Sequence, residues 1–218
     1  MSASGCAVRF LGIRPYRQVW DAMAAFTAAR DEDTPDELWV LEHEPVFTQG
    51  QTGKPEHVLD AHGIEVVQSD RGGQVTYHAP GQLIVYFLLN VRRRGYGVRA
   101  LVDLIERSLL RLLAEFGIAG TLRPGAPGVY VGDAKIAALG LRIRRGCSMH
   151  GLSLNVDLDL APFTWINSCG YPGLAATSLR QLLPDAPPTL LEDTRARLVA
   201  ILQKELQEAL QAESVRKA

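Results

Sequence analysis

The sequence has almost no net charge, and lysine is scarce in it. Its 218 residues include 23 lysines and arginines against 24 aspartates and glutamates, which leaves a formal charge of −1. Proteins that neutralise a phosphate backbone carry a clear excess of basic residues, so the composition argues against a nucleic-acid partner. Of the basic residues 19 are arginines, and the only lysines are Lys54, Lys135, Lys204 and Lys217.

Long hydrophobic runs are also missing, and cysteines are few. The longest apolar stretch, Leu83–Val91, has the length of a β-strand, whereas roughly 20 apolar residues are needed to cross a bilayer. Residues 1–16 have no basic segment followed by an apolar one, so we expect no secretory signal. Three cysteines argue against a disulfide scaffold and for a reducing compartment. We therefore expect a cytoplasmic protein with no membrane partner.

Patterns that bind metals or nucleotides are absent as well. The three cysteines and five histidines show no short paired spacing such as C-x-x-C or H-x-x-x-H. The sequence has no G-x-x-x-x-G-K-[ST] loop and no G-x-G-x-x-G loop after a strand. We therefore expect no metal site and neither of these nucleotide-binding loops.

The order of hydrophobic patterns predicts one α/β (α+β) domain over residues 1–218. Helical spacing of apolar residues predicts helices over 16–30, over Leu101–Phe116 and from Leu198 to Leu210. A β-type run starts at Leu38 and becomes irregular at Pro45. Further strands are predicted at 64–68, 82–91, 129–131, 134–143 and 147–158, the last three joined by tight turns. We expect a mixed sheet covered by about three helices.

A first unusual stretch, Asp70–Gln82, combines glycines with polar side chains. The pair Gly72 and Gly73 lets a ligand approach the backbone closely, and Arg71 beside it can bind a carboxylate or phosphate. Further hydrogen-bonding groups follow at Thr76, Tyr77 and His78. The alternative is a glycine-rich turn with a surface histidine, because short glycine patterns are common.

A second stretch, Gly132–Ile143, places Lys135 at the start of an apolar strand. The small residues Ala137 and Ala138 follow it. A desolvated pocket lowers the pKa of a lysine, so that it exchanges protons near neutrality. The alternative is a lysine on the solvent face of the strand.

A third stretch, Phe163–Gly173, places Cys169 in a loop rich in glycine and proline. A thiolate is a strong nucleophile, and an ammonium nearby favours it. Lys135 is the candidate ammonium, whereas His78 and His150 are the bases that a Cys–His hydrolase would use. The residues alone therefore indicate a cysteine acyl-transfer enzyme with a glycine-rich substrate loop.

In these stretches the sequence resembles the lipoyl(octanoyl) transferase family, from about Trp39 to Leu183. RGGQVTYHAPGQL, residues 71–83, is similar to the family's R-G-G-x-x-T-Y-H-G-P-G-Q block, with Ala79 where glycine is usual. HGLSLNVDLDL, residues 150–160, is similar to its H-G-x-x-L-N-V strand. INSCGY resembles its P-C-G element, with Ser168 in place of proline.

The resemblance implies the fold of the biotin and lipoate protein ligases, with the catalytic domain over residues 33–213. By the same resemblance, Cys169 accepts the acyl group, and Lys135 falls on the family's functional lysine. The family's acyl-binding positions fall on three segments of this sequence: Arg71, Gly72, Gly73, Gln74, Val75, Thr76, Tyr77 and His78; Ala138, Leu139 and Gly140; and Gly151, Leu152 and Ser153.

The activity that the resemblance implies is an acyltransferase reaction of lipoate biosynthesis. An octanoyl group would move from acyl carrier protein through a thioester on Cys169 to a lysine of a lipoyl domain. Such domains occur in 2-oxoacid dehydrogenases and in glycine cleavage H protein. Because exchange of a thioester for an amide is downhill, we expect no ATP and no metal cofactor.

Other functions remain open at this point. An ATP-dependent lipoate or biotin ligase is one, although the G-R-G-R-x-G-R type of loop of biotin ligases is absent. A Cys–His acyl thioesterase with His78 as its base is another, and a non-catalytic carrier-binding module is a third. Two arginine clusters, Arg92–Arg94 with Arg99 and Arg142 with Arg144–Arg145, are either solvated loops or a docking surface for acidic acyl carrier protein.

Overall fold

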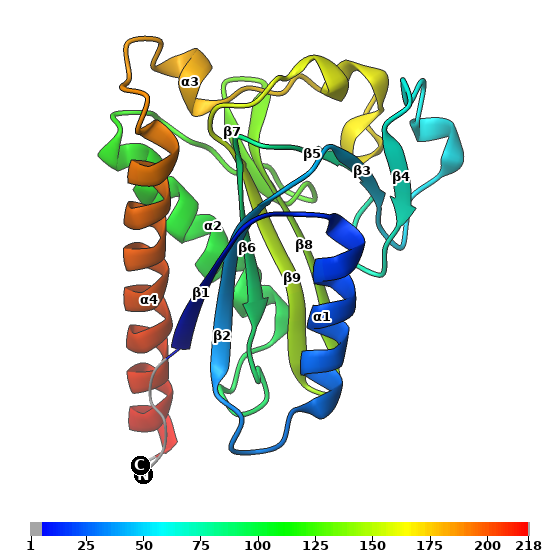
Figure 1. The fold of residues 1–218 in the computed structure, drawn as a ribbon. Helices are drawn as coiled ribbons and strands as arrows, with labels where there is room; N and C mark the ends of the chain where they lie inside the picture. The colour runs from blue at the N-terminus through cyan, green and yellow to red at the C-terminus, as the bar shows by residue number, and fades with distance from the viewer. Residues whose placement is uncertain (1–5, 218) are drawn as a thin grey trace.

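The computed structural model describes the backbone of residues 6–217 and the side chains of residues 6–210. Its larger sheet contains β1 (Cys6–Arg14), β2 (Asp36–His43), β6 (Gln82–Leu88), β7 (Gly128–Val131), β8 (Ala134–Arg144) and β9 (Cys147–Asn155). These strands lie in the order β1-β2-β6-β9-β8-β7 (Figure 1). β1 is parallel to β2, and the other neighbouring pairs are antiparallel. The predicted mixed sheet is confirmed.

Helices cover both faces of this sheet. They are α1 (Tyr16–Ala29), α2 (Val98–Glu115), the single turn α3 (Leu179–Leu182) and α4 (Leu190–Lys217). α2 and α4 pack together on one face, and α1 lies against the other (Figure 1). The three long helices match those predicted from apolar spacing, and Gly117 ends α2 with a φ of +72°.

Strand β6 lies at the centre of the sheet and is buried on both sides. Val85 and Phe87 face the core under α2 and α4, whereas Ile84 and Tyr86 face α1. Burial on both faces explains why this strand reads as a continuous apolar run instead of an alternating pattern. The sheet therefore has two hydrophobic cores, one for each layer of helices.

A second sheet of three short strands was not predicted in full. It contains β3 (Val46–Gln49), β4 (Glu65–Gln68) and β5 (Val75–His78), in the order β4-β3-β5. The residues of β3 were predicted to be irregular and those of β5 to belong to a loop, and both predictions are wrong. In β3 and β5 the four residues mix polar and apolar side chains and show no clear pattern in the sequence. Each is stabilised by pairing with a strand that lies elsewhere in the chain.

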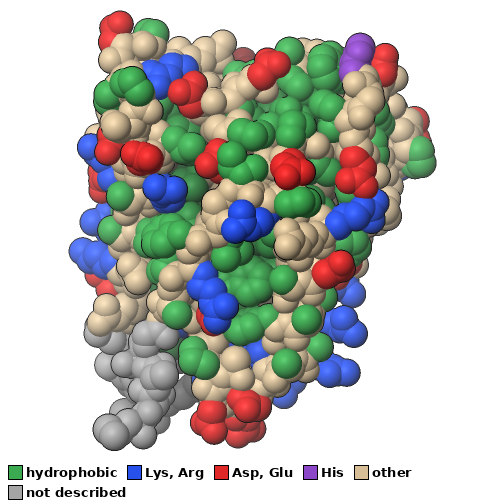
Figure 2. Space-filling view, in the orientation of Figure 1, with side chains coloured by type: hydrophobic (Ala, Val, Ile, Leu, Met, Phe, Trp, Pro, Cys, Tyr) green, Lys and Arg blue, Asp and Glu red, His purple; other side chains and the backbone are tan. Residues whose placement is uncertain are grey.

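The N-terminal strand β1 was also missed. It is an edge strand with mixed burial, and Phe10 and Ile13 on it are 59% and 46% exposed. Figure 2 shows hydrophobic side chains gathered among charged ones on the face that includes β1. Residues 1–5, on which the expectation about a secretory signal partly depends, lie outside the described residues. Among the helices that the structure describes, none has the length and apolar character needed to cross a bilayer.

Candidate active site

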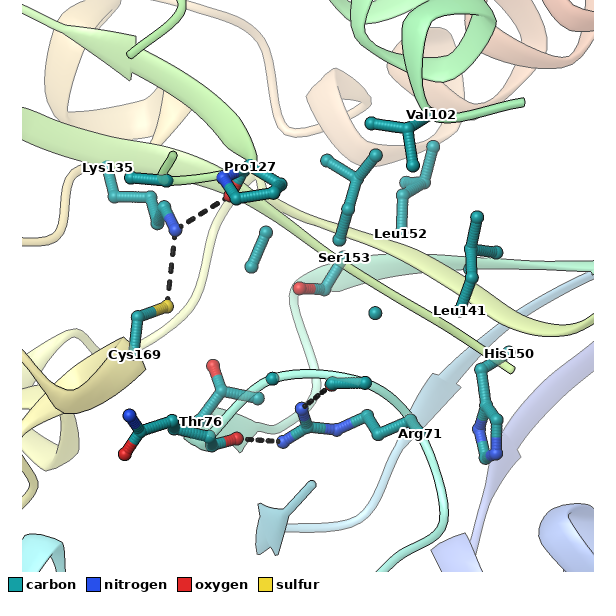
Figure 3. Close-up of a pocket in the computed structure, with 18 of the residues that line it drawn as sticks. Arg71, Thr76, Val102, Pro127, Lys135, Leu141, His150, Leu152, Ser153 and Cys169 are labelled. Carbon is teal, nitrogen blue, oxygen red and sulfur yellow. Dashed lines mark hydrogen bonds between the residues drawn. The ribbon is translucent and has the colours of Figure 1, made fainter. Parts of the chain in front are cut away.

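Lys135 and Cys169 form a hydrogen-bonded pair at one end of β8. The Lys135 ammonium donates to the Cys169 sulfur over 3.2 Å and to the Pro127 carbonyl over 3.0 Å (Figure 3). The chain after Cys169 holds the pair together, because the Lys135 amide donates to Ala175 and the Lys135 carbonyl accepts from Thr177. Two residues 34 positions apart are therefore fixed next to each other by the backbone.

Gly128 leaves the space that the Lys135 side chain occupies. A Cβ on Gly128 would lie 2.9 Å from Cε of Lys135 and 2.4 Å from the Ala137 carbonyl oxygen. The glycine also has a φ of +127°, which L side chains rarely adopt. Any larger residue here would displace the lysine or the strand.

Cys169 lies in a tight turn with an unusual backbone conformation. The 3₁₀ turn Ser168–Gly170 contains Cys169 at φ 56° and ψ 19°, in the left-handed region. This conformation costs a non-glycine residue about 1–2 kcal/mol, so the surrounding structure must enforce it. Gly170 follows at φ +77°, and a Cβ there would lie 2.5 Å from the Gln74 amide nitrogen. The turn directs the thiol toward Lys135 (Figure 3).

The charge of Lys135 is stabilised in place. The side chain is buried, and burial lowers the pKa of a lysine. The charge of Cys169 and the nearby Tyr130 outweigh this effect, and the pKa of Lys135 lies above its ordinary value. The predicted lowering of the pKa of Lys135 is therefore wrong, because the interactions with Cys169 and Tyr130 outweigh burial. Lys135 is held as an ammonium that donates to the Cys169 sulfur.

A cavity of about 390 Å³ adjoins this pair. One wall is the segment from Arg71 through β5, and the other is formed by β8 and β9, with Val102 of α2 at the side (Figure 3). Ala138 and Gly140 on β8 keep the space between the walls open, since a Cβ on Gly140 would lie 3.0 Å from the Gly72 carbonyl oxygen. Gly151 on β9 also lines the cavity, but its missing Cβ faces the Val85 carbonyl and Phe87. The cavity therefore suits a slender apolar group that leads to the sulfur.

Arg71 fastens the first wall. Its guanidinium donates to the Thr48 hydroxyl and carbonyl and to the carbonyls of Gly72 and Gln74. The interpretation of Arg71 as a binder of carboxylate or phosphate stays a prediction, and in this structure its donors are directed to the protein itself. The wall is also joined to β8, because the Gly72 amide donates to the Leu141 carbonyl over 3.0 Å.

The comparisons with known proteins agree on one family. The family described as "Lipoyl protein ligase A/B catalytic domain" matches residues 15–203. An octanoyltransferase of Klebsiella pneumoniae is 58% identical over 195 residues, which cover 89% of this chain and 90% of that protein. One of Cellvibrio japonicus is 62% identical over 177 residues, covering 81% and 82%.

The chain belongs to the octanoyltransferase family. Solved structures agree with the fold: lipoate-protein ligase A bound with ATP has a TM-score of 0.73 at 13% identity, covering 96% of this chain and 93% of that one. Biotin protein ligase of Aquifex aeolicus has a TM-score of 0.55 at 12% identity, covering 94% and 71%. The predicted resemblance to the ligase fold is confirmed.

In this octanoyltransferase most of the predicted site residues share the cavity. Lys135 and Cys169 line it together with Arg71, Gly72, Gly73, Gln74, Thr76, His78, Ala138, Leu139, Gly140, Gly151, Leu152 and Ser153. Val75 and Tyr77 do not line it. They point to the opposite face of β5, into the core cluster with Phe47 and Phe163, because successive side chains of a strand alternate between its faces.

The two histidines considered as bases have other partners. Nδ1 of His78 donates to the Gln82 carboxamide oxygen over 2.7 Å, and Nε2 accepts from the Thr48 hydroxyl. Burial holds the pKa of His78 well below its usual value. Nε2 of His150 donates to Asp70 over 2.7 Å. Lysine is therefore the partner of Cys169, and a Cys–His thioesterase is not favoured.

Several residues that line the cavity were not predicted from the sequence. The Pro127 carbonyl, which accepts from Lys135, gives no signal in the sequence. Others come from segments that read as ordinary core or loop: Tyr16, Thr52, Ile84, Tyr86, Val98, Val102, Gly125, Ala126, Leu141 and Tyr171. Of the two departures from the family motif, Ala79 has no positive φ and so fits its position without strain.

Proposed function

We propose that this octanoyltransferase moves an octanoyl group from acyl carrier protein to a lysine of a lipoyl domain, through a thioester on Cys169. The observation that carries the proposal is the 3.2 Å contact of Lys135 and Cys169 beside a cavity lined with small and apolar residues. The 62% identity to the octanoyltransferase of Cellvibrio japonicus favours octanoyl as the acyl group.

In the first half-reaction the Cys169 thiolate attacks the thioester carbonyl carbon. A bond forms between sulfur and carbon, and the carbonyl electron pair moves to oxygen. Collapse of this intermediate breaks the bond to the carrier's sulfur, and the departing thiolate takes a proton from the Lys135 ammonium. Free carrier thiol and an octanoyl-Cys169 thioester result, with Lys135 now neutral.

In the second half-reaction a neutral lysine amine of the acceptor attacks the same carbonyl carbon. Lys135 removes the proton that this amine must lose, and the Cys169 thiolate departs. An amide has formed, and the ammonium–thiolate pair is restored. We infer that neither ATP nor a metal is needed, because the thioester supplies the driving force and the pair accounts for both proton transfers.

Partner choice follows from the same chemistry. We infer that the donor is acyl carrier protein and that the acceptors are lipoyl domains of 2-oxoacid dehydrogenases and of glycine cleavage H protein. None of Cys6, Cys147 and Cys169 forms a disulfide, which is consistent with the reducing cytoplasm that we infer as the location.

Mass spectrometry after mixing with octanoyl-acyl carrier protein tests the proposal. We expect one octanoyl group on Cys169, sensitive to hydroxylamine, and none in the Cys169→Ala variant. Adding a lipoyl domain should move the group to a hydroxylamine-resistant amide without ATP and in the presence of a chelator. An adduct on Cys6 or Cys147, release of free octanoate, or dependence on ATP would overturn it.

A further inference from the structure

One nitrogen at the far end of the cavity has no partner. His150 lines the cavity and is 1% exposed, and Figure 3 shows it at the end away from Lys135 and Cys169. Its Nε2 donates to Asp70, but its Nδ1 is buried and forms no hydrogen bond with any residue in the described part of the chain. A buried polar atom without a partner is costly, so this nitrogen limits what the cavity can hold beside it.

The neighbouring polar groups at this end of the cavity are engaged. The Tyr86 hydroxyl, whose ring contacts the histidine, bonds to Nε2 of His43 over 2.6 Å. The Tyr16 hydroxyl bonds to Ser69 over 2.6 Å. Among the described residues that line the cavity, Gln74 has the other buried atom without a partner, and it lies at the opposite end, against the turn of the nucleophile. The histidine nitrogen is therefore the unsatisfied polar atom at this end.

The partner of Nε2 determines what Nδ1 can do. Hydrogen bonds from His150 and Trp20 lower the pKa of Asp70, so its carboxylate is ionised and can only accept. The ring therefore carries its proton on Nε2. Burial lowers the pKa of His150, which keeps the ring neutral at pH 7. Nδ1 thus has a lone pair and no hydrogen, and it needs a donor.

The span from the catalytic pair to this nitrogen suits an octanoyl chain. Nζ of Lys135 lies beside Gly128, which pairs with Ala138 of β8. The histidine pairs with Leu141, three residues further along the same strand, which is roughly 10 Å at a rise of about 3.3 Å per residue. The two walls of the cavity meet at this level, because the Gly72 amide donates to the Leu141 carbonyl. An extended octanoyl chain on the sulfur is of similar length.

We infer that His150 sets the length of the acyl chain that the cavity accepts, and that Asp70 positions its ring. The inference rests on the proposed function and adds a specificity-determining residue to it. An octanoyl chain ends before Nδ1, so water can still donate to the nitrogen. A longer chain places an apolar group against Nδ1 and excludes water, which leaves the lone pair unsatisfied. Longer chains are disfavoured for this reason.

The test compares two acyl groups of nearly the same size. Nonanoyl and ω-hydroxyoctanoyl differ only in the last group, which is a methyl in the first and a hydroxyl in the second. The hydroxyl can donate to Nδ1, whereas the methyl cannot. When both compete as thioesters of acyl carrier protein, wild type should transfer ω-hydroxyoctanoyl to a lipoyl domain with a kcat/KM roughly tenfold above that of nonanoyl. Mass spectrometry of the lipoyl domain gives this ratio.

Variants show whether Nδ1 carries the preference. His150→Leu removes the acceptor and should reverse the ratio in favour of nonanoyl. His150→Gln has an amide that can donate to Asp70 and an oxygen that can accept, so it should keep the preference for the hydroxyl. The matched control is His57→Leu, which should keep the wild-type ratio, because Nδ1 of His57 is also buried without a partner among the described residues but does not line the cavity.

Each result is a ratio within one variant, so an overall loss of activity does not affect it. Equal transfer of the two groups by wild type, or a preference for nonanoyl, would overturn the inference without recourse to any variant. An unchanged ratio in His150→Leu would also overturn it, as would the same reversal in His57→Leu. Failure of wild type to transfer octanoyl from acyl carrier protein would count against the proposed function instead.

Discussion

The three cysteines of the chain differ in what surrounds each sulfur. Burial raises the pKa of Cys6 to about 12, so this residue stays a thiol at neutral pH. Cys147, the first residue of β9, is 7% exposed. Only Cys169, among the three, receives a hydrogen bond from an ammonium. Reactivity is therefore determined by one neighbouring side chain and not by the thiol group alone.

Replacing Lys135 tests this dependence directly. Lys135→Met keeps the length of the side chain and removes the charge, so we expect alkylation of Cys169 at pH 7 to slow roughly tenfold. The rise of the alkylation rate with pH should move to higher pH. Lys54→Met, at an exposed lysine that pairs with Glu56, is the matched control. An unchanged pH profile in Lys135→Met would contradict the role given to this residue.

A buried histidine makes the stability of the protein depend on pH. Burial lowers the pKa of His43 to about 4; Nδ1 donates to the Arg14 carbonyl, and Nε2 accepts from Tyr86. In the unfolded chain the pKa is about 6.5, so only the unfolded state takes up the proton between pH 6.5 and 4. Stability from this group is therefore present above pH 6.5 and falls as the pH drops toward 4.

We expect this histidine to account for about 2 kcal/mol of the stability lost between pH 7 and pH 5. Urea unfolding of His43→Gln at both pH values should show a correspondingly smaller decrease than wild type. Histidine His62, which is exposed, supplies the control variant His62→Gln. The same decrease in wild type and His43→Gln would show that His43 does not stay neutral in the fold.

At the scale of elements, the prediction from sequence succeeded where a pattern is local. The apolar stripe of α2, the buried run of β6 and the turns between β7, β8 and β9 each lie within a continuous segment. It failed at β1, β3 and β5, which gain their stability from partners elsewhere in the chain. The candidate nucleophile and lysine were recognised by residue type and family motif, but the backbone bonds from Lys135 to the loop after Cys169 leave no pattern.

A glycine substitution tests how β7 and β8 hold the lysine. Gly128→Ala should destabilise the protein by roughly 2–4 kcal/mol and slow alkylation of Cys169, because the new Cβ meets the Ala137 carbonyl and Lys135. Gly125→Ala is the comparison, since Gly125 also has a positive φ of +75° but has nothing within 4 Å of a Cβ. Its cost should be the backbone strain alone, about 1–2 kcal/mol. Equal effects would contradict the crowding at Gly128.

At the scale of the whole molecule, the near-zero net charge hides a local excess of arginine. Arg93 and Arg94 of the first predicted cluster pair with Asp36, and Arg99 pairs with Asp103. Arg92 is the member of that cluster without an ion pair among the described residues. Its amide donates to the Gly146 carbonyl, which places it beside the turn that contains Arg144 and Arg145. The candidate docking surface is therefore Arg92 with Arg142, Arg144 and Arg145, none of which has an ion pair in the described part of the chain.

Charge reversal tests this surface as a docking site for acidic acyl carrier protein. The pair Arg144→Glu and Arg145→Glu should lower kcat/KM for octanoyl-acyl carrier protein roughly tenfold at low salt, and the loss should shrink as salt is added. Turnover of a small octanoyl thioester should not change. Arg17→Glu on α1 is the control, because Arg17 already pairs with Glu65. Loss on both substrates, or none on either, would remove this surface from the mechanism.

The backbone hydrogen bonds of Lys135 fix the strand that carries this lysine to the loop that carries Cys169. The Lys135 carbonyl accepts from the Thr177 amide, and the Lys135 amide donates to the Ala175 carbonyl. The loop that follows Cys169 and β8 therefore cannot separate without breaking both hydrogen bonds. The segment from Arg71 to Gln74, which forms the opposite wall, is held by other bonds: the amides of Gly50, Gln51 and Thr52 donate to its carbonyls, and its Gly72 amide donates to Leu141 of β8. The loop that carries the nucleophile and the wall that faces it are therefore fixed to β8 independently of each other.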